Sequence, residues 1–277
     1  MRQYKALFFV SYIFYLTSQG SVAQHSITQS ISDTRSMGSG NCGVAFSNPV
    51  NFINNTAYLG LIQESGFYTN YSSYFLIQGI SQINIQGIYS NSNSSGWGLH
   101  LSRDGSKEWN ENLIGIAYSR KVSTHSSIGI QLNAIQRQQI ESGNSTTLSP
   151  SIGALFQIIP NLILATQINN PIPIQKNNRP IVNSQFKFGL NYKVYQQLNF
   201  LTEFNASQNI TTFIQFGLEY KPMDRLSFRT GYVSNGLITA GFSVVVKNKL
   251  NLELGYSLHP VLNNSAGLGL SYYFNKK

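Results

Sequence analysis

The strongest constraint on this chain is a two-residue alternation of apolar and polar side chains that recurs from Phe67 to Phe274. Residues 186–192, for example, read Phe-Lys-Phe-Gly-Leu-Asn-Tyr. A helix, with a period of about 3.6 residues, could not gather these apolar residues on one face, whereas a strand places alternate residues on opposite faces. The pattern therefore predicts strands whose two faces meet different surroundings.

Alternation and turn residues place about fourteen strands between Gly66 and the end of the chain. Each strand with its connection takes roughly 15 residues, which suits the ~10-residue spans of membrane barrels better than the shorter strands of a soluble sandwich or a small soluble barrel. The predicted strands lie near residues 67–77, 82–90, 96–102, 112–120, 127–137, 148–157, 161–168, 184–193, 197–206, 212–221, 225–234, 236–246, 249–257 and 265–274.

The predicted connections alternate in length, as they do in outer-membrane barrels, which have short turns at one end and long loops at the other. The short ones lie near residues 121–127, 159–161, 194–196, 222–224 and 247–248, and the long ones near 103–111, 138–147, 169–183, 207–211 and 258–264. Aromatic residues collect at the segment ends, where headgroups would surround them: Tyr118, Tyr192, Tyr220, Tyr232, Tyr256, Tyr272 and Phe274. We therefore predict an all-β fold, a transmembrane antiparallel β-barrel in the outer membrane of a Gram-negative bacterium, in contact with membrane lipid.

The composition agrees with a membrane barrel. Only 10% of the residues are charged and 13% are aromatic, whereas soluble domains carry about 25% charged residues. Beyond the first 23 residues no apolar stretch approaches the ~18 residues of a transmembrane helix. The net charge of +9 comes from scattered residues without a basic helix, zinc spacing or RNA-binding motif, so we expect no nucleic-acid partner.

The first 23 residues predict a secretory signal peptide. Arg2 and Lys5 form a basic start, an apolar run covers residues 6–16, and Ser21-Val22-Ala23 is a small-residue cleavage site. We accordingly divide the chain into a signal peptide (1–23), an N-terminal periplasmic or plug segment (24–65) and a barrel (66–277). Cys42 is the only cysteine, which excludes an intramolecular disulfide and favours a small, unreactive thiol.

The chain ends in alternating apolar residues, Leu268, Leu270, Tyr272 and Phe274, followed by Asn-Lys-Lys. This end resembles the C-terminal recognition signal of outer-membrane proteins. The resemblance implies that the barrel-assembly machinery is a partner and that Phe274 carries the signal.

The strand faces opposite the leucines and aromatics carry charges that would point into the lumen. Because an unpaired charge away from water is costly, we expect an ion-pair network that ties the wall together. A patch that selects a permeating solute is the alternative. The candidate residues are Lys187, Glu203, Glu219, Arg229 and Glu253, together with Lys193 and Lys221.

Nothing in the sequence predicts an enzyme. The histidines His25, His100, His125 and His259 have no acidic partner nearby in sequence, and neither GxSxG nor HExxH occurs. We therefore expect no catalytic residue, metal site or cofactor, and we expect His100 to be a hydrogen-bonding residue of the lumen. The glycine-rich run 37–43 lacks the GK[ST] ending of a phosphate-binding loop.

Residues 35–59 resemble the N-terminal motif of FadL-like and PorV/PorQ-type outer-membrane barrels. The resemblance rests on Arg35 and the glycines Gly38, Gly40 and Gly43, on the pair Val44-Ala45, and on Asn55, Ala57 and Leu59, which match an Asn-Pro-Ala-x-Leu element in which Thr56 replaces the proline. Residues 217–222 and 226–232 resemble the closing hairpins of the same group. The resemblance implies a fourteen-stranded barrel with an inward-folded plug.

The same resemblance implies two functions. One is a non-enzymatic role in protein secretion or surface assembly of the type IX kind, with secretion-system proteins as partners. The other is a FadL-like passive channel for small hydrophobic molecules. We favour the secretion role here, because the barrel leaves little sequence for an external domain that would capture a ligand.

Overall fold

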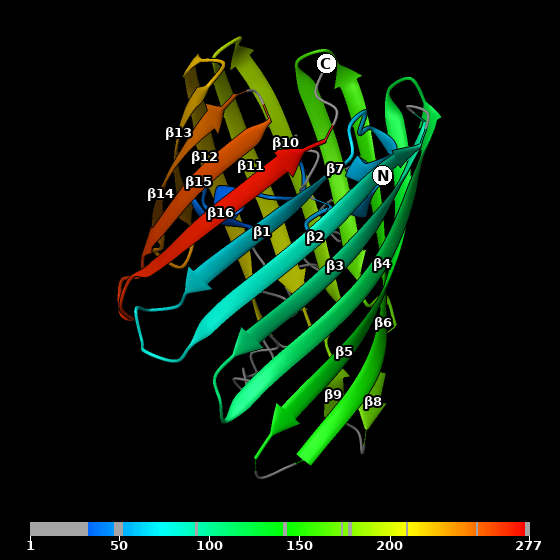
Figure 1. Ribbon diagram of the computed structural model, residues 1–277, viewed down its shortest axis with the longest axis vertical. Helices are drawn as coiled ribbons and strands as arrows, with labels where there is room; N and C mark the ends of the chain where they lie inside the picture. Colours follow the sequence, from blue (N-terminus) through cyan, green and yellow to red (C-terminus); the bar gives the residue numbers. More distant parts are fainter. Residues whose placement is uncertain are drawn as a thin grey trace, which may run out of the picture.

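A computed structural model describes residues 33–46, 52–91, 94–140, 143–172, 174–176, 179–208, 210–247 and 249–274. Fourteen antiparallel strands form a closed barrel (Figure 1). They are β1 (Gly66–Ser73), β2 (Ser81–Asn91), β3 (Ser95–Gly105), β4 (Trp109–Ser123), β5 (Ser126–Gln139), β6 (Gly143–Ile159), β7 (Leu162–Asn169), β10 (Gln185–Tyr195), β11 (Leu198–Ser207), β12 (Ile210–Met223), β13 (Leu226–Val233), β14 (Ile238–Val246), β15 (Leu250–Leu258) and β16 (Ser265–Tyr273).

The all-β barrel prediction is confirmed, and each of the fourteen predicted strands corresponds to one strand of the wall. The first strand pairs with the last, with Gly66 opposite Tyr273, so the sheet has no open edge. Closure matters in a membrane, because lipid offers no hydrogen bonds to unpaired backbone groups.

The alternation in the sequence separates the outer surface of the barrel from its interior. On β15, Leu252, Leu254 and Tyr256 are exposed, whereas Glu253 and Ser257 between and beside them are buried. The other strands follow the same rule, so large apolar side chains cover the outside and polar ones fill the inside. An apolar exterior on a closed barrel matches the hydrocarbon region of a bilayer. Within the described ranges, no helix is long and apolar enough to cross a membrane.

Several predicted long loops are instead tight hairpins. The strand β3 continues to Gly105 and β4 begins at Trp109, while β5 ends at Gln139 and β6 begins at Gly143. The predicted loops 103–111 and 138–147 are therefore mostly strand, and 207–211 is similarly short. These strand ends are polar on both faces, so the alternation disappears although the backbone ladder continues. In Figure 1 the ends of β4, β5 and β6 extend beyond their neighbours at the bottom of the view.

Two further boundaries differ from the prediction. The first predicted strand, 67–77, ends at Ser73, because Phe75 and Leu76 adopt positive φ values in the turn that follows. The predicted loop 169–183 contains a small hairpin of its own, β8 (Ile174–Lys176) with β9 (Arg179–Val182). We call the end of the barrel that carries these connections the loop end and the opposite one the turn end.

The described part of the N-terminal segment lies inside the barrel, as the fold prediction requires. Its helix α2 (Thr34–Met37) contacts β1, β14, β15 and β16, and its 3₁₀-helix η2 (Thr56–Gly60) contacts β2 to β6 on the other side. This plug, residues 33–46 and 52–62, therefore crosses the lumen, where Figure 1 shows it in blue. The predicted signal peptide lies outside the described residues.

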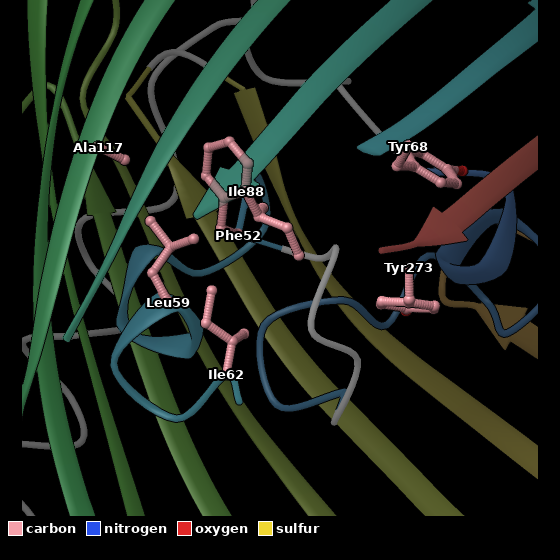
Figure 2. Close-up of a cluster of buried hydrophobic side chains, with 7 residues drawn as sticks. All are labelled: Phe52, Leu59, Ile62, Tyr68, Ile88, Ala117 and Tyr273. Carbon is pink, nitrogen blue, oxygen red and sulfur yellow. The ribbon is translucent and has the colours of Figure 1, made fainter. Parts of the chain in front are cut away.

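Apolar packing also holds the plug. Phe52, Leu59 and Ile62 form a buried cluster with residues of the wall (Figure 2). The wall residues are Tyr68, Ile88, Ala117 and Tyr273. The outer face of the barrel is apolar toward lipid, so burial of apolar side chains from water stabilises the plug only inside the barrel, in this cluster and in the smaller ones around Val44 and Phe46.

Candidate functional site

One buried carboxylate joins the plug to the wall. Glu219 on β12 accepts from Arg35 Nη2 of α2 at 2.7 Å and from Arg229 Nε on β13 at 3.0 Å, both on Oε1. Its other oxygen is 3.0 Å from Lys221 Nζ and 3.0 Å from Asn199 Nδ2. The side chain of Glu219 is fully buried. We call this arrangement of Arg35, Glu219, Arg229 and Lys221 the charge latch.

An aromatic ring of the plug completes the surroundings of the latch. The guanidinium carbon of Arg35 lies 4.3 Å from the centre of the Phe46 ring, and that of Arg229 lies 5.9 Å from it. Both distances fall within the range of cation–π attraction. The plug thus supplies a cation and a ring to a site whose anion belongs to the wall.

A second carboxylate of the wall binds the backbone of the plug. Glu203 Oε2 accepts from the amide nitrogens of Gly43 and Val44 at 2.7 and 2.8 Å. Beside these amides Cys42 is buried against Phe46 and Leu201. Burial, with a contribution from Glu203, raises the pKa of the Cys42 thiol well above its usual value, which keeps it in the unreactive form.

The glycines of the plug allow backbone to touch backbone. A Cβ on Gly38 would lie 2.7 Å from Gly241 Cα of β14, and a Cβ on Gly40 would lie 2.3 Å from Phe216 O of β12. Gly40 also has a φ of +68°, a conformation that side-chain-bearing residues avoid. A Cβ on Gly231 of β13 would likewise overlap the backbone of Gly40. Only glycine fits at these positions, because any side chain would overlap the facing backbone.

The other half of the plug is held by hydrogen bonds from Asn55 and to Ala57. Asn55 caps η2 through Ala57 N at 3.0 Å, and its amide nitrogen donates to Val44 O at 3.1 Å. The carbonyl of Ala57 accepts from the hydroxyls of Ser119 and Ser127 at 3.0 and 2.8 Å. Replacement of the motif's proline by Thr56 is accommodated, since Thr56 N and Oγ1 both lie 3.3 Å from Gln167 Oε1.

The structure brings together two groups of residues that the sequence presented separately. Arg35 of the plug motif and Arg229 of the lumen set both donate to Glu219, and Glu203 accepts from the amide of Gly43. Leu59 packs in the cluster of Figure 2.

Glu253, Lys187 and Phe274, all predicted site residues, lie outside the latch. Glu253 accepts from Asn251 at 2.8 Å and interacts electrostatically with Arg229 and Arg35. Lys187 makes no salt bridge with the described residues. Phe274 lies on the outer surface at the turn end, 6.2 Å from the Phe67 ring.

A cavity of about 630 Å³ occupies the lumen between the plug and the loop end. Met37, Asn41 and Asn54 of the plug line it on one side, and Tyr74, Phe75, Trp109, Phe213, Leu237 and Leu262 supply rings and aliphatic groups nearer the loop end. Lys187 and Gln185 line both this cavity and a smaller one of about 40 Å³ beside His100. The lumen therefore combines an entrance of mixed apolar and polar side chains with a polar, partly charged floor.

Sequence reasoning missed several residues of this lumen. Asp33 and Asn54 hold α2 to the rest of the plug through a 2.6 Å hydrogen bond, and Tyr68 OH accepts from Thr34 N at 3.0 Å. His100, by contrast, was expected in the lumen as a hydrogen-bonding residue, and its Nε2 lies 3.2 Å from Asn84 Oδ1. Extending the alternation of β3 past residue 102 would have placed Asp104 on the inner face as well. Of the missed residues, only Asp104 could have been predicted from the strand alternation.

Comparison with known proteins identifies the fold. No family model matches the sequence, and no curated protein matches it significantly. Among solved structures, the toluene transporter TbuX of Ralstonia pickettii superposes with a TM-score of 0.65 and 13% identity, covering 87% of this chain and 98% of that one. The toluene transporter TodX of Pseudomonas putida has a TM-score of 0.66 and 10% identity, covering 87% of this chain and 97% of its own. The monoaromatic hydrocarbon channel CymD has a TM-score of 0.66 and 12% identity, covering 88% of this chain and 97% of its own. The chain therefore shares the barrel fold of these hydrocarbon channels.

Proposed function

We propose that this protein is a passive, non-enzymatic channel for small hydrophobic molecules in the outer membrane of a Gram-negative bacterium. The observation that carries the proposal is the cavity of about 630 Å³ between the plug and the loop end. Its volume is typical of sites for small molecules, and its surface is mostly apolar although many of the lining residues are polar. The hydrocarbon channels that share the fold support the same conclusion, with monoaromatic compounds as the first solutes to test.

The plug controls passage in this proposal. A solute that enters from the loop end meets Met37, Asn41 and Asn54 at the base of the cavity. Met37 and Asn41 belong to a segment that the charge latch and Glu203 hold in place. The solute can therefore pass further only when part of the plug changes its position. The channel is therefore closed at rest and passes single molecules when the plug shifts.

The comparisons favour this second interpretation over secretion. The secretion role rests on the resemblance of residues 35–59, 217–222 and 226–232, and a plugged channel accounts for these residues equally well. None of the three structures compared above is described as a secretion component or an enzyme. Export through residues 1–23 and assembly through the signal around Phe274 remain parts of the proposal.

Filling the cavity should block transport. Ser257 lines the cavity on β15, and its cross-strand neighbours Thr239 and Ser265 are also small. We expect Ser257→Trp to lower the uptake of radiolabelled toluene into proteoliposomes several-fold, because the indole occupies the path. Leu258→Trp, on the adjacent outward position, is the matched control and should transport normally, since aromatic residues suit the membrane interface.

The proposal fails if the wild-type chain gives no uptake above empty liposomes. Equal uptake by Ser257→Trp and wild type would place the path elsewhere. Co-purification of the chain with secretion proteins from outer membranes, without any toluene uptake, would restore the secretion interpretation.

A further inference from the structure

A row of polar side chains crosses four strands near the loop end. Gln82 of β2 pairs in register with Asp104 of β3, Asp104 with Glu111 of β4, and Glu111 with Arg137 of β5. All four lie on the inner face, and Gln82, Asp104 and Glu111 are 0, 3 and 3% exposed. Two carboxylates are therefore direct cross-strand neighbours in a buried position.

The hydrogen bonds of this row leave oxygen atoms without donors. Arg137 directs both Nε and Nη2 to Glu111 Oε1, at 3.0 and 2.6 Å. Gln82 Nε2 donates to Asp104 Oδ2 at 3.0 Å, and the Gly105 amide also bonds to Asp104. Glu111 Oε2 and Gln82 Oε1 are buried and have no hydrogen-bond partner among the described residues. Gln82 Oε1 belongs to the amide whose Nε2 donates to Asp104, so it lies in the same part of the lumen.

This arrangement is unfavourable unless something positive joins it. Like charges directly opposite each other on antiparallel strands repel, and a buried acceptor without a partner costs free energy. Among the described residues, Arg137 donates to Glu111 Oε1, and Glu111 Oε2 receives no hydrogen bond. Two carboxylates and an amide oxygen are the hard donors that Ca²⁺ selects, and Ca²⁺ accepts water for the rest of its roughly six to eight ligands. Gln82 and Asp104 line the large cavity, which gives ions and water access.

We propose that Gln82, Asp104 and Glu111 form a Ca²⁺ site at the loop end of the barrel. The ion bridges β2, β3 and β4 and fixes the β3–β4 hairpin, whose Ser106 and Trp109 line the same cavity. The site thereby sets the shape of the entrance. This inference stands independently of which solute the channel carries.

Terbium luminescence tests the site directly on the full chain in detergent. Tb³⁺ replaces Ca²⁺ and emits when a nearby tryptophan is excited; of the two tryptophans, Trp109 is in this hairpin, whereas Trp97 is on the outer surface. We expect saturable emission that Ca²⁺ displaces. Loss of a partner outside the ligand shell already weakens metal sites by about tenfold or more, so Asp104→Asn and Glu111→Gln should weaken binding at least that much. Glu108→Gln, in the exposed turn of the same hairpin, is the matched control and should bind normally.

Thermal unfolding provides a second readout. Ca²⁺ should raise the Tm of the wild type and of Glu108→Gln but leave the Tm of Asp104→Asn unchanged. If Asp104→Asn does not fold, Trp109→Phe takes its place and should lose the emission while keeping the Ca²⁺ effect on Tm. The proposal is overturned if Ca²⁺ does not change the Tm of the wild type, or if the emission persists in Asp104→Asn or in Trp109→Phe. An unchanged wild-type Tm would indicate that the two carboxyl groups share a proton instead of an ion.

Discussion

Replacing Glu219 by glutamine should release the plug and open the barrel to solutes that the wild type excludes. The substitution keeps the shape of the side chain but leaves the Arg35 and Arg229 guanidinium groups buried together without their anion. Removing one partner of a buried ion pair costs about 3–5 kcal/mol. Arg229 is on a strand that backbone hydrogen bonds hold in the wall, whereas Arg35 is on the plug. The unpaired charges therefore regain water when the plug undocks from the lumen.

The measurement is influx of a small sugar into proteoliposomes, with the heat-modifiable gel band as a check that the barrel has folded. Arg35→Met is the informative companion, because it removes the cation of the plug and leaves Glu219 paired with Arg229 and Lys221. We expect influx to rise most in Glu219→Gln and less in Arg35→Met. If both folded variants exclude the sugar as well as the wild type does, the charge latch does not hold the plug.

Gly231→Ala should also displace the plug, because the added methyl group overlaps the plug backbone and not because an ion pair is lost. The added Cβ would lie 2.1 Å from Gly40 N and 2.5 Å from Gly40 Cα. Both atoms are backbone, and the positive φ of Gly40 leaves it little freedom to adapt. Overpacking of this kind costs about 1–3 kcal/mol, while alanine itself suits a strand better than glycine, so the barrel should form and the plug should not seat.

Gly87→Ala is the matched control for this experiment. Gly87 lies on β2, and a Cβ there would meet nothing within 4 Å. Sugar influx should therefore rise in Gly231→Ala and remain at the wild-type level in Gly87→Ala. Trypsin accessibility of Arg35 gives an independent measure, since an undocked plug exposes the bond after that residue. A Gly231→Ala barrel whose Arg35 stays protected would contradict the close contact between β13 and the plug.

The strand period was sufficient to predict the wall, because alternation reports locally which face of each strand meets lipid. It failed where that contrast ends. Residues 103–105 and 109–111 continue β3 and β4 beyond the apolar band, and polar side chains lie on both faces there. The prediction consequently shortened β3 to residue 102 and missed Asp104, which belongs to the row across β2 to β5.

The sequence alone determined the fourteen strands, their inward and outward faces, and the presence of charges in the lumen. Only the tertiary structure decided which charges meet. Arg35 and Glu219 are 184 residues apart in sequence, and Gly38 reaches Gly241 only because the sheet closes and its register brings β12 to β14 against the plug. Alternation is a local property of each strand, whereas the latch, the glycine contacts and the cavity depend on closure and register. For that reason the plugged barrel was predictable from the sequence, and the arrangement that makes it a candidate channel was not.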